Sequence, residues 1–278
     1  LRDGRSILRM HHPGNRVLKY LRKSLFGLAV LLLAAALLLW FLPARWVAPW
    51  IEPQLHGLQL REVHGLLWNG QADRVTGSDG RVLGHLHWRL SRRALFGQVR
   101  LQLEFHGPQL DFTGAMQTLP AGQVEWRDVS LHAAFDALGE PVQLPWGQPR
   151  GELQLAITRV LLQGGWPLQM HADAQWRHAL MHTRAGDVAL GELQAQSQAQ
   201  DGVIQVRLRD DGHGPLHVEG HLQLSPLGWR LDAVLHPRQT ADQALRHWLA
   251  GLGSPAADGS VHIQRHGGLA GVTAPPSN

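Results

Sequence analysis

Histidine is the residue type most able to support chemistry in this sequence, which has 18 histidines and no cysteine. Without cysteine, neither a disulfide framework nor a thiolate metal site is possible, so metal binding has to be considered for the histidines. His85 and His87 stand two residues apart, so on a strand both would face one side and could chelate a zinc ion. No carboxylate near them in the sequence completes such a ligand set.

A second histidine series, His213, His217 and His221, recurs at intervals of four residues. On a helix these side chains would share a face, but the glycines and the proline among them favour a strand. Two histidines four residues apart on a strand are separated by about 13 Å, too far to share one ion. We therefore predict surface or structural histidines and no metal site.

Other catalytic patterns are missing from the sequence. It contains no nucleophile elbow, phosphate-binding loop or HExxH stretch. Asp210 and Asp211 precede Gly212, which is ordinary turn chemistry. The 11 tryptophans could form a stacking platform for sugars or bases, but most stand in alternating strand positions or near an apolar segment, which favours packing. We predict no catalytic residue and no cofactor.

The net charge of +4 arises at the N-terminus, because residues 1–24 contain seven basic residues and only one acidic residue, Asp3. The rest of the chain is close to neutral, so the basic balance indicates membrane topology and no nucleic-acid partner. The seven are Arg2, Arg5, Arg9, Arg16, Lys19, Arg22 and Lys23.

Residues 25–42 read LFGLAVLLLAAALLLWFL and carry no charge. A helix of this length is close to the roughly 20 residues that cross a bilayer, and the basic residues before it place the N-terminus in the cytoplasm. Trp40, Phe41, Trp46 and Trp50 suit an interfacial aromatic belt, and Pro43 ends the helix. The alternative is a cleaved signal peptide, but the run is long for one and no small-x-small cleavage site follows.

The remainder of the chain is predicted to form strands, because apolar and polar residues alternate in most segments. Glycine- and proline-containing turns separate the segments, which indicates antiparallel hairpins. Two stretches, 47–56 and 240–252, are predicted to be helical, the second with Asp242 near its start and Gly253 at its end. The alternating segments include 85–90, 99–106, 204–209, 216–224 and 229–235, with Gly220 in the apolar register of its segment.

A loose internal repeat relates Val124-Glu-Trp126-Arg-Asp-Val129 to Ala174-Gln-Trp176-Arg-His-Ala179, and residues 82–86 to 189–193. It predicts two related β units flanking a proline-rich joint over residues 141–149. The expected organisation is a basic tail over 1–24, a transmembrane helix over 25–42, β units over 43–140 and 150–268, and a disordered tail over 269–278. The predicted fold class is mainly β: one transmembrane helix, a curved and largely antiparallel sheet with two related halves, and a short helix in the C-terminal region.

The order of the short motifs resembles the type II secretion system protein N family. The opening V-x-G-x-x-W-x-G over residues 63–70, followed by Leu83-Gly84 and His87-Trp88-Arg89-Leu90, is the most specific part, and the resemblance extends over residues 28–268. It implies an inner-membrane, non-enzymatic component that interacts with other proteins of the secretion machine, with its β domain in the periplasm. Positions predicted to be structural, from the resemblance and the repeat, are Gly65, Trp68, Gly70, Gly84, Trp88, Trp126, Trp176 and Gly191.

Three functional hypotheses follow. The first is an assembly or partner-binding component of type II secretion, acting through strand edges or an exposed strand face. The second is a lipid-handling β groove, similar to AsmA-type envelope proteins, if the apolar face of the sheet has no second layer. The third is a metal-dependent envelope hydrolase that uses the histidines. Whether the β units join into one sheet is the observation that best separates them.

Overall fold

In the computed structural model the described part of the chain is residues 26–268, without residues 27, 29, 35, 36, 56, 78, 79, 136–143, 240 and 241 and without the side chain of Gln54. The predicted tails over 1–24 and 269–278 and part of the joint over 141–149 lie outside it. So does part of the predicted transmembrane helix, whose described residues 26, 28, 30–34 and 37–40 are helical. Among the described residues, no single helix combines the length and the apolar character that crossing a bilayer requires.

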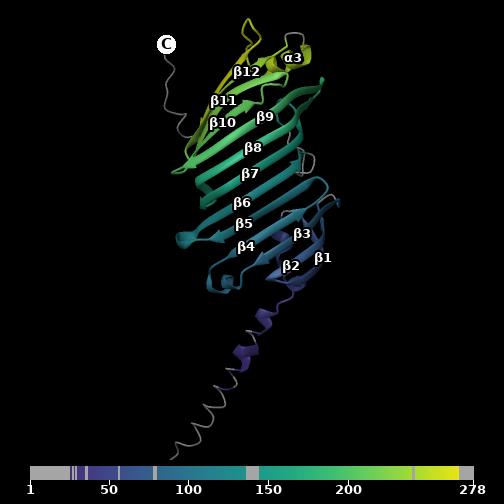
Figure 1. Ribbon diagram of the computed structural model, residues 1–278, viewed down its shortest axis with the longest axis vertical. Helices are drawn as coiled ribbons and strands as arrows, with labels where there is room; N and C mark the ends of the chain where they lie inside the picture. Colours follow the sequence, from purple (N-terminus) through teal and green to yellow (C-terminus); the bar gives the residue numbers. More distant parts are fainter. Residues whose placement is uncertain are drawn as a thin grey trace, which may run out of the picture.

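Thirteen strands in the described part form one antiparallel sheet in which each strand pairs with the next one along the chain. Figure 1 shows them stacked along the long axis of the molecule, with the N-terminal helical segment leaving at one end. The strands are β1 (Gln59–Leu66), β2 (Asn69–Thr76), β3 (Val82–Leu90), β4 (Arg100–His106), β5 (Leu110–Thr118), β6 (Gln123–Ala134), β7 (Gln148–Gln163), β8 (Trp166–Thr183), β9 (Gly186–Gln200), β10 (Val203–Asp210), β11 (Leu216–Ser225), β12 (Gly228–Pro237) and β13 (Val261–Gly268).

The sheet is not closed, because β1 and β13 stand at its two edges and do not pair with each other. The prediction of a mainly β, largely antiparallel fold is therefore confirmed. β6 and β7 pair directly on either side of the predicted joint, so the two predicted β units belong to one continuous sheet. Their division into separate units stays a prediction.

Short helical elements precede the first and the last strand and also lie in two of the connections between strands. α2 (Ala44–Ile51) and the 3₁₀ turn η1 (Glu52–Leu55) precede β1, the turns η2 (Arg92–Phe96) and η3 (Pro120–Gly122) lie between strands, and α3 (Gln243–Leu252) precedes β13. The predicted helix over 47–56 begins earlier and ends sooner than expected. Pro43 takes the extended position before α2, and Pro49, which has no N–H to donate, stands close to its end.

α3 confirms the predicted C-terminal-region helix. It starts at Gln243, and the side chain of Asp242 accepts a hydrogen bond from the N–H of Leu245 at 2.9 Å, which satisfies an otherwise unpaired amide of the first turn. Leu245 and Leu249 are fully buried and form the centre of one hydrophobic cluster. The other buried members come from the strands of that end: Ala179, Met181, Val188, Leu190, Leu216, Val218, Leu235 and Val261.

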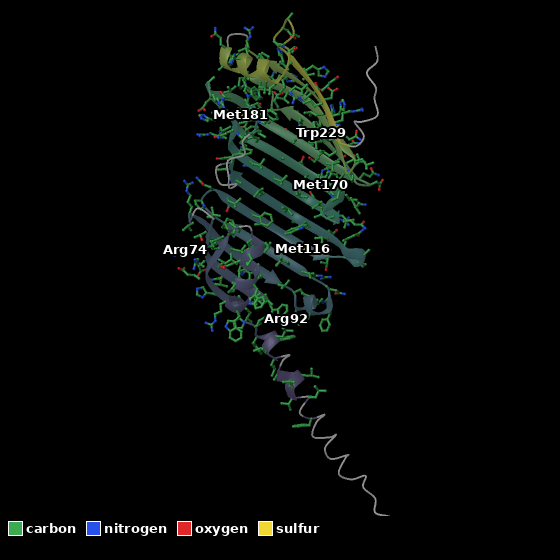
Figure 2. The ribbon with its side chains drawn as sticks, turned by 180° about the vertical axis from the view of Figure 1, so that it is seen from behind. Arg74, Arg92, Met116, Met170, Met181 and Trp229 are labelled. Atoms are coloured by element: carbon green, nitrogen blue, oxygen red, sulfur yellow. The ribbon has the colours of Figure 1, made fainter. Side chains whose placement is uncertain are left out.

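A smaller cluster fills the opposite end, around Ala72, Val75 and Phe105 of β2 and β4. Between the two clusters the sheet carries one apolar and one polar face, as the alternation predicts. Cross-strand pairing aligns an unbroken apolar row from β3 to β13, and Figure 2 labels three of its members, Met116, Met170 and Trp229. The row is Leu90, Leu101, Met116, Trp126, Val160, Met170, Ala199, Ile204, Leu224, Trp229 and Gly267.

The internal repeat has a counterpart in the backbone. Asp128 and His178, each two residues after a repeat tryptophan, adopt φ of 51° and 49°, a left-handed conformation uncommon outside glycine. Each lies where the strand pairing shifts its register, opposite Gly114 and close to Gly191 respectively. The Trp-Arg-x triplet thus marks the same kind of β-bulge on β6 and β8.

Candidate functional site

Four of the predicted structural residues, Gly65, Trp68, Gly70 and Trp88, are brought together at the turn between β1 and β2, whereas Gly84 lies further along β3. Gly65 and Gly70 are paired across this hairpin, and the indole N–H of Trp88 donates to the carbonyl oxygen of Leu67 at 3.0 Å. A Cβ on Gly70 would lie 2.4 Å from a ring carbon of Trp88, so only glycine lets that ring pack here. Gly84 stands on β3 opposite Val75, where the β2–β3 register shifts.

Trp68 connects this hairpin to the N-terminal segment. Its side chain is buried, and its indole N–H donates to the carbonyl oxygen of Leu39 at 3.1 Å. The N–H of Leu67 donates to the carbonyl oxygen of Leu42 at 2.9 Å. These bonds fix the last residues of the apolar stretch against β1 and β2.

The remaining predicted structural residues lie on other strands and do not join the first group. Trp126 packs edge-on against Phe112 with ring centroids 6.2 Å apart. The indole N–H of Trp176 donates to the carbonyl oxygen of Arg150 at 2.8 Å. Gly191 pairs with Ala179 next to the β8 bulge. The structural role of all eight positions stays a prediction, since contacts alone do not measure it.

The histidines are distributed along the sheet as partners of single carboxylates. Nδ1 of His217 lies 2.8 Å from Asp210, and Nε2 of His262 lies 2.8 Å from Asp232. His87 lies 3.8 Å from Glu104, whereas the ring of His85 lies tilted against that of His106, with ring centroids 5.6 Å apart. Nowhere in the described part do three or more histidine, aspartate or glutamate side chains gather in a way that could hold a metal ion.

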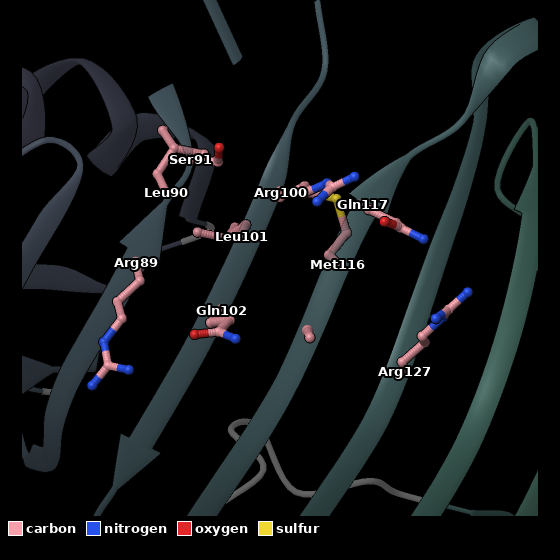
Figure 3. Close-up of a pocket in the computed structure, with 10 residues that line it drawn as sticks. Arg89, Leu90, Ser91, Arg100, Leu101, Gln102, Met116, Gln117 and Arg127 are labelled. Carbon is pink, nitrogen blue, oxygen red and sulfur yellow. The ribbon is translucent and has the colours of Figure 1, made fainter. Parts of the chain in front are cut away.

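The sheet carries a hollow of about 370 Å³ over β3 to β6 (Figure 3), whose lining includes Leu90, Ser91, Leu101 and Met116 as well as a group of polar-face residues. We call it the basic hollow and define it by its polar-face residues Arg89, Arg100, Gln102, Ala115, Gln117 and Arg127. Arg89, Gln102, Ala115 and Arg127 are cross-strand neighbours in one row, and Figure 3 shows the two arginines extending on either side of Gln102. Ala115 is the small residue of this row, which leaves room between the long side chains.

The charge of the basic hollow is positive. Within the described part of the chain, Arg89 and Arg100 form no ion pair, whereas Arg127 lies 2.9 Å from Glu125. Arg159 lies one strand further on, paired with Arg127 across β6–β7. Guanidinium groups with nearby amides are suited to bind carboxylates or phosphates, so the hollow can hold an anionic group.

Glu125 anchors the edge of the basic hollow, although only 1 % of its side chain is exposed. Its carboxylate accepts hydrogen bonds from Arg127, from Nε of Arg159 at 2.5 Å and from the amide of Gln117. Burial raises the pKa of Glu125, but the hydrogen bonds from Arg127, Gln117 and Arg159 outweigh it, so the pKa lies below its usual value. Glu125 is therefore an ionised, fully satisfied structural carboxylate.

A second hollow, of about 340 Å³, lies over β10 to β12 and centres on Asp210, whose side chain is 3 % exposed. Asp210 accepts hydrogen bonds from the N–H groups of Val218 and Gly212, both at 2.9 Å, and from His217 and Arg238. Burial raises the pKa of Asp210, and these bonds lower it far more, to well below its ordinary range. Its carboxylate connects the end of β10 to β11 and to Arg238 directly after β12, a role beyond the turn chemistry that the sequence indicates.

Comparison with known proteins identifies the family. The family described as "Type II secretion system (T2SS), protein N" matches residues 56–264. This chain belongs to the type II secretion system protein N family. Family membership supports a role as a component of the type II secretion system, and the resemblance seen in the sequence is confirmed.

Two curated relatives carry the same name, "Type II secretion system protein N". The one from Vibrio cholerae serotype O1 (strain ATCC 39315 / El Tor Inaba N16961) is 26% identical over 227 residues, covering 78% of this chain and 87% of that protein. The one from Aeromonas hydrophila is 26% identical over 247 residues, covering 86% and 97%. No solved structure matches the chain.

The basic hollow is not indicated by any of the sequence patterns described above. Arg89, Arg100 and Arg127 stand in polar positions of three predicted strands, which is an available signal. Only the register of β3 to β6 brings them to one place, and alternation alone does not fix which residues of neighbouring strands are paired.

Proposed function

We propose that this protein acts without catalysis in the assembly of the type II secretion machine, by binding acidic segments of other components in its basic hollow. In this proposal the helix over residues 25–42 holds the chain in the inner membrane, residues 1–24 lie in the cytoplasm and the sheet lies in the periplasm. The single observation that carries the binding role is the group of three arginines around Ala115 with one buried carboxylate beside it.

The geometry favours an acidic protein segment as the ligand of the hollow. Arg89 and Arg100 are exposed and unpaired in the described part, so a carboxylate can bind them without displacing an internal partner. The hollow is shallow and lies on a sheet face, which suits an extended segment better than an enclosed small molecule. Binding through such exposed charges weakens as salt screens them.

Charge reversal of the hollow tests this function in the intact protein. In a strain that lacks the chromosomal copy, full-length protein carrying Arg89→Glu and Arg100→Glu is expected to recover less of the other secretion components on co-purification and to secrete less substrate. Arg230→Glu is the matched control, because Arg230 lies on the same face in β12 at the other end of the sheet. Equal recovery and secretion with both variants, at equal protein level, would refute the acidic-segment proposal.

The apolar face supports a second candidate, the AsmA-like handling of lipid. The described helices that pack on the sheet are α3, against β9, β12 and β13, and α2, against β1. Between them Met116, Trp126 and Met170 are only half-buried, although each lies within the continuous apolar row. Acyl chains of a phospholipid are the natural ligand for such a face.

Bound phospholipid in the purified full-length protein distinguishes the two candidates. Met170→Glu puts a charge on the apolar face, and the control Gln205→Glu puts one on the polar face. Both variants keep the membrane helix and therefore the lipid that surrounds it. Lipid handling predicts a lower phospholipid content in Met170→Glu alone. If wild type and both variants contained the same amount of phospholipid, all of it could be assigned to the membrane helix, and the lipid-handling candidate would be refuted.

A further inference from the structure

The end of the sheet that adjoins the apolar helix exposes several large apolar side chains. In the 3₁₀ turn η2, Phe96 is 86% exposed and Leu95 is 44% exposed. Trp40 and Phe41 at the end of the helical segment, and Trp46 and Trp50 in α2, are also exposed. Exposed aromatic residues gathered at one end of a protein mark an interaction surface.

η2 holds its apolar residues outward by a closed set of local hydrogen bonds. The hydroxyl of Ser91 accepts from the N–H of Arg93 at 3.3 Å, and Gly97 ends the turn in a left-handed conformation with its N–H donating to Ala94 at 3.1 Å. The N–H of Ser91 donates to the carbonyl oxygen of Arg100 at 2.8 Å, which ties both ends of the turn to β3 and β4. The outward position of Phe96 is therefore part of a formed turn.

Arg92 places η2 beside the end of the apolar helix. Its guanidinium lies over the ring of Trp40, 4.3 Å from the ring centroid, a favourable cation–π geometry. Figure 2 shows Arg92 where the N-terminal helical segment meets the sheet. The indole N–H of Trp68 also donates to the carbonyl oxygen of Leu39, so the helical residues next to Trp40 are held in place relative to η2.

The charges of this surface are all positive. Residues 37–50 and 91–100 contain arginine but no aspartate or glutamate. In the part of the chain that the structure describes, Arg45, Arg92 and Arg93 form no ion pair. Aromatic and aliphatic side chains together with arginines that form no ion pair match the interface of a bilayer, where anionic lipid attracts basic residues.

We propose that η2 is a second membrane contact, in which Leu95 and Phe96 enter the lipid interface and Arg92 and Arg93 meet anionic lipid phosphates. This inference rests on the proposed function, in which residues 25–42 lie in the membrane. With two contacts, the helix and η2, the sheet would be held in one orientation relative to the bilayer. Its basic hollow, on β3 to β6 next to η2, would then lie at a defined height above the lipid.

A fluorescence experiment on the full chain tests the contact. The sequence has no cysteine, so single cysteines can be labelled with the environment-sensitive dye NBD without changing any native residue elsewhere. Leu95→Cys reports on η2 and keeps Phe96, Leu31→Cys reports on the helix, and Leu227→Cys, in the exposed turn between β11 and β12, is the control. Each labelled protein is placed in nanodiscs of phosphatidylcholine, with or without phosphatidylglycerol, and quenching by brominated acyl chains is measured.

The proposal predicts loss of NBD fluorescence at positions 31 and 95 but not at 227, with stronger quenching at 95 when phosphatidylglycerol is present. Phe96→Asp is expected to remove the quenching at 95 and leave that at 31. Quenching at 31 alone would overturn the η2 contact and support the membrane helix. Quenching at 95 without 31 would support η2 and overturn the helix, and quenching at 227 as well would refute a localised contact.

The arginines are tested separately in the Leu95→Cys protein. Arg92→Gln together with Arg93→Gln is expected to reduce quenching in phosphatidylglycerol nanodiscs to the level seen in phosphatidylcholine alone. Unchanged quenching would show that the apolar residues act without the phosphates, which contradicts the charged part of the proposal.

Discussion

The carboxylate of Glu125 accepts a hydrogen bond of 2.5 Å from Nε of Arg159 on the neighbouring strand β7, although only 1 % of the glutamate side chain is exposed to solvent. Arg159 and Arg127, by contrast, are about half exposed. A buried carboxylate is thus covered by two solvated guanidinium groups and the amide of Gln117. The arrangement fixes the side chains at one edge of the basic hollow.

Removal of this carboxylate should destabilise the protein moderately. Glu125→Ala loses charge-assisted hydrogen bonds, which contribute about 1.5–3 kcal/mol each, but both arginines can regain water, so we expect a loss of about 1–3 kcal/mol in the free energy of unfolding. Urea unfolding of the full-length protein measures it. Glu219→Ala, a change at an exposed glutamate of β11, is the control and should have little effect. If Glu125→Ala left the free energy of unfolding unchanged, the buried ion cluster would not stabilise the sheet.

The stability of the sheet should fall in acid. The pKa values of Glu125 and Asp210 are lowered in the folded protein, so in the unfolded chain both groups bind protons at higher pH than in the folded state. Their contribution is therefore complete above the unfolded carboxyl values of about 4 and is lost as the pH falls below them. Urea unfolding at pH 7 and at pH 3 should show a smaller difference between wild type and Asp210→Asn at the lower pH. A constant difference would contradict this linkage.

Gly70 should tolerate no side chain while Trp88 is present. A Cβ at this position would lie 2.4 Å from the Trp88 ring and 2.8 Å from the carbonyl oxygen of Leu66, so Gly70→Ala is expected to cost about 1–3 kcal/mol. Thermal unfolding measures the change. Gly251→Ala in α3, where a Cβ would meet no atom within 4 Å, should instead gain about 0.5–1 kcal/mol from helix propensity. Equal effects of the two substitutions would rule out the steric reason.

The local features of the fold were predictable from the sequence, because alternation and capping are short-range signals. Gly220 was predicted in the apolar register and lies buried between Leu208 and Ala233. The C-terminal-region helix and its Asp242 cap follow from helical spacing and cap chemistry. The predicted start of the first helix at residue 47 is wrong, because Pro43 has the extended conformation that precedes a helix and α2 begins directly after it at Ala44.

The long-range features were not predictable in the same way. Pairing of β6 with β7 on either side of the predicted joint depends on contacts between residues far apart in sequence, such as Glu125 with Arg159. The basic hollow depends on the register of β3 to β6, whose pair Ala115–Arg127 lies just before the bulge at Asp128; that bulge shifts only the later pairs of β6 with β5. Alternation assigns a residue to a face, but it does not say which residues of other strands stand beside it.

The two bulges offer a final prediction. A left-handed residue other than glycine costs about 1–2 kcal/mol, and Asp128 adopts φ of 51°. Asp128→Gly should therefore raise the free energy of unfolding by up to about 1 kcal/mol, after the cost of added freedom in the unfolded chain is subtracted. Ser130→Gly, two residues along the same strand, should lower it by about 0.5–1 kcal/mol. Urea unfolding of both variants decides the matter, since a loss in both would mean that Asp128 stabilises its bulge through its side chain.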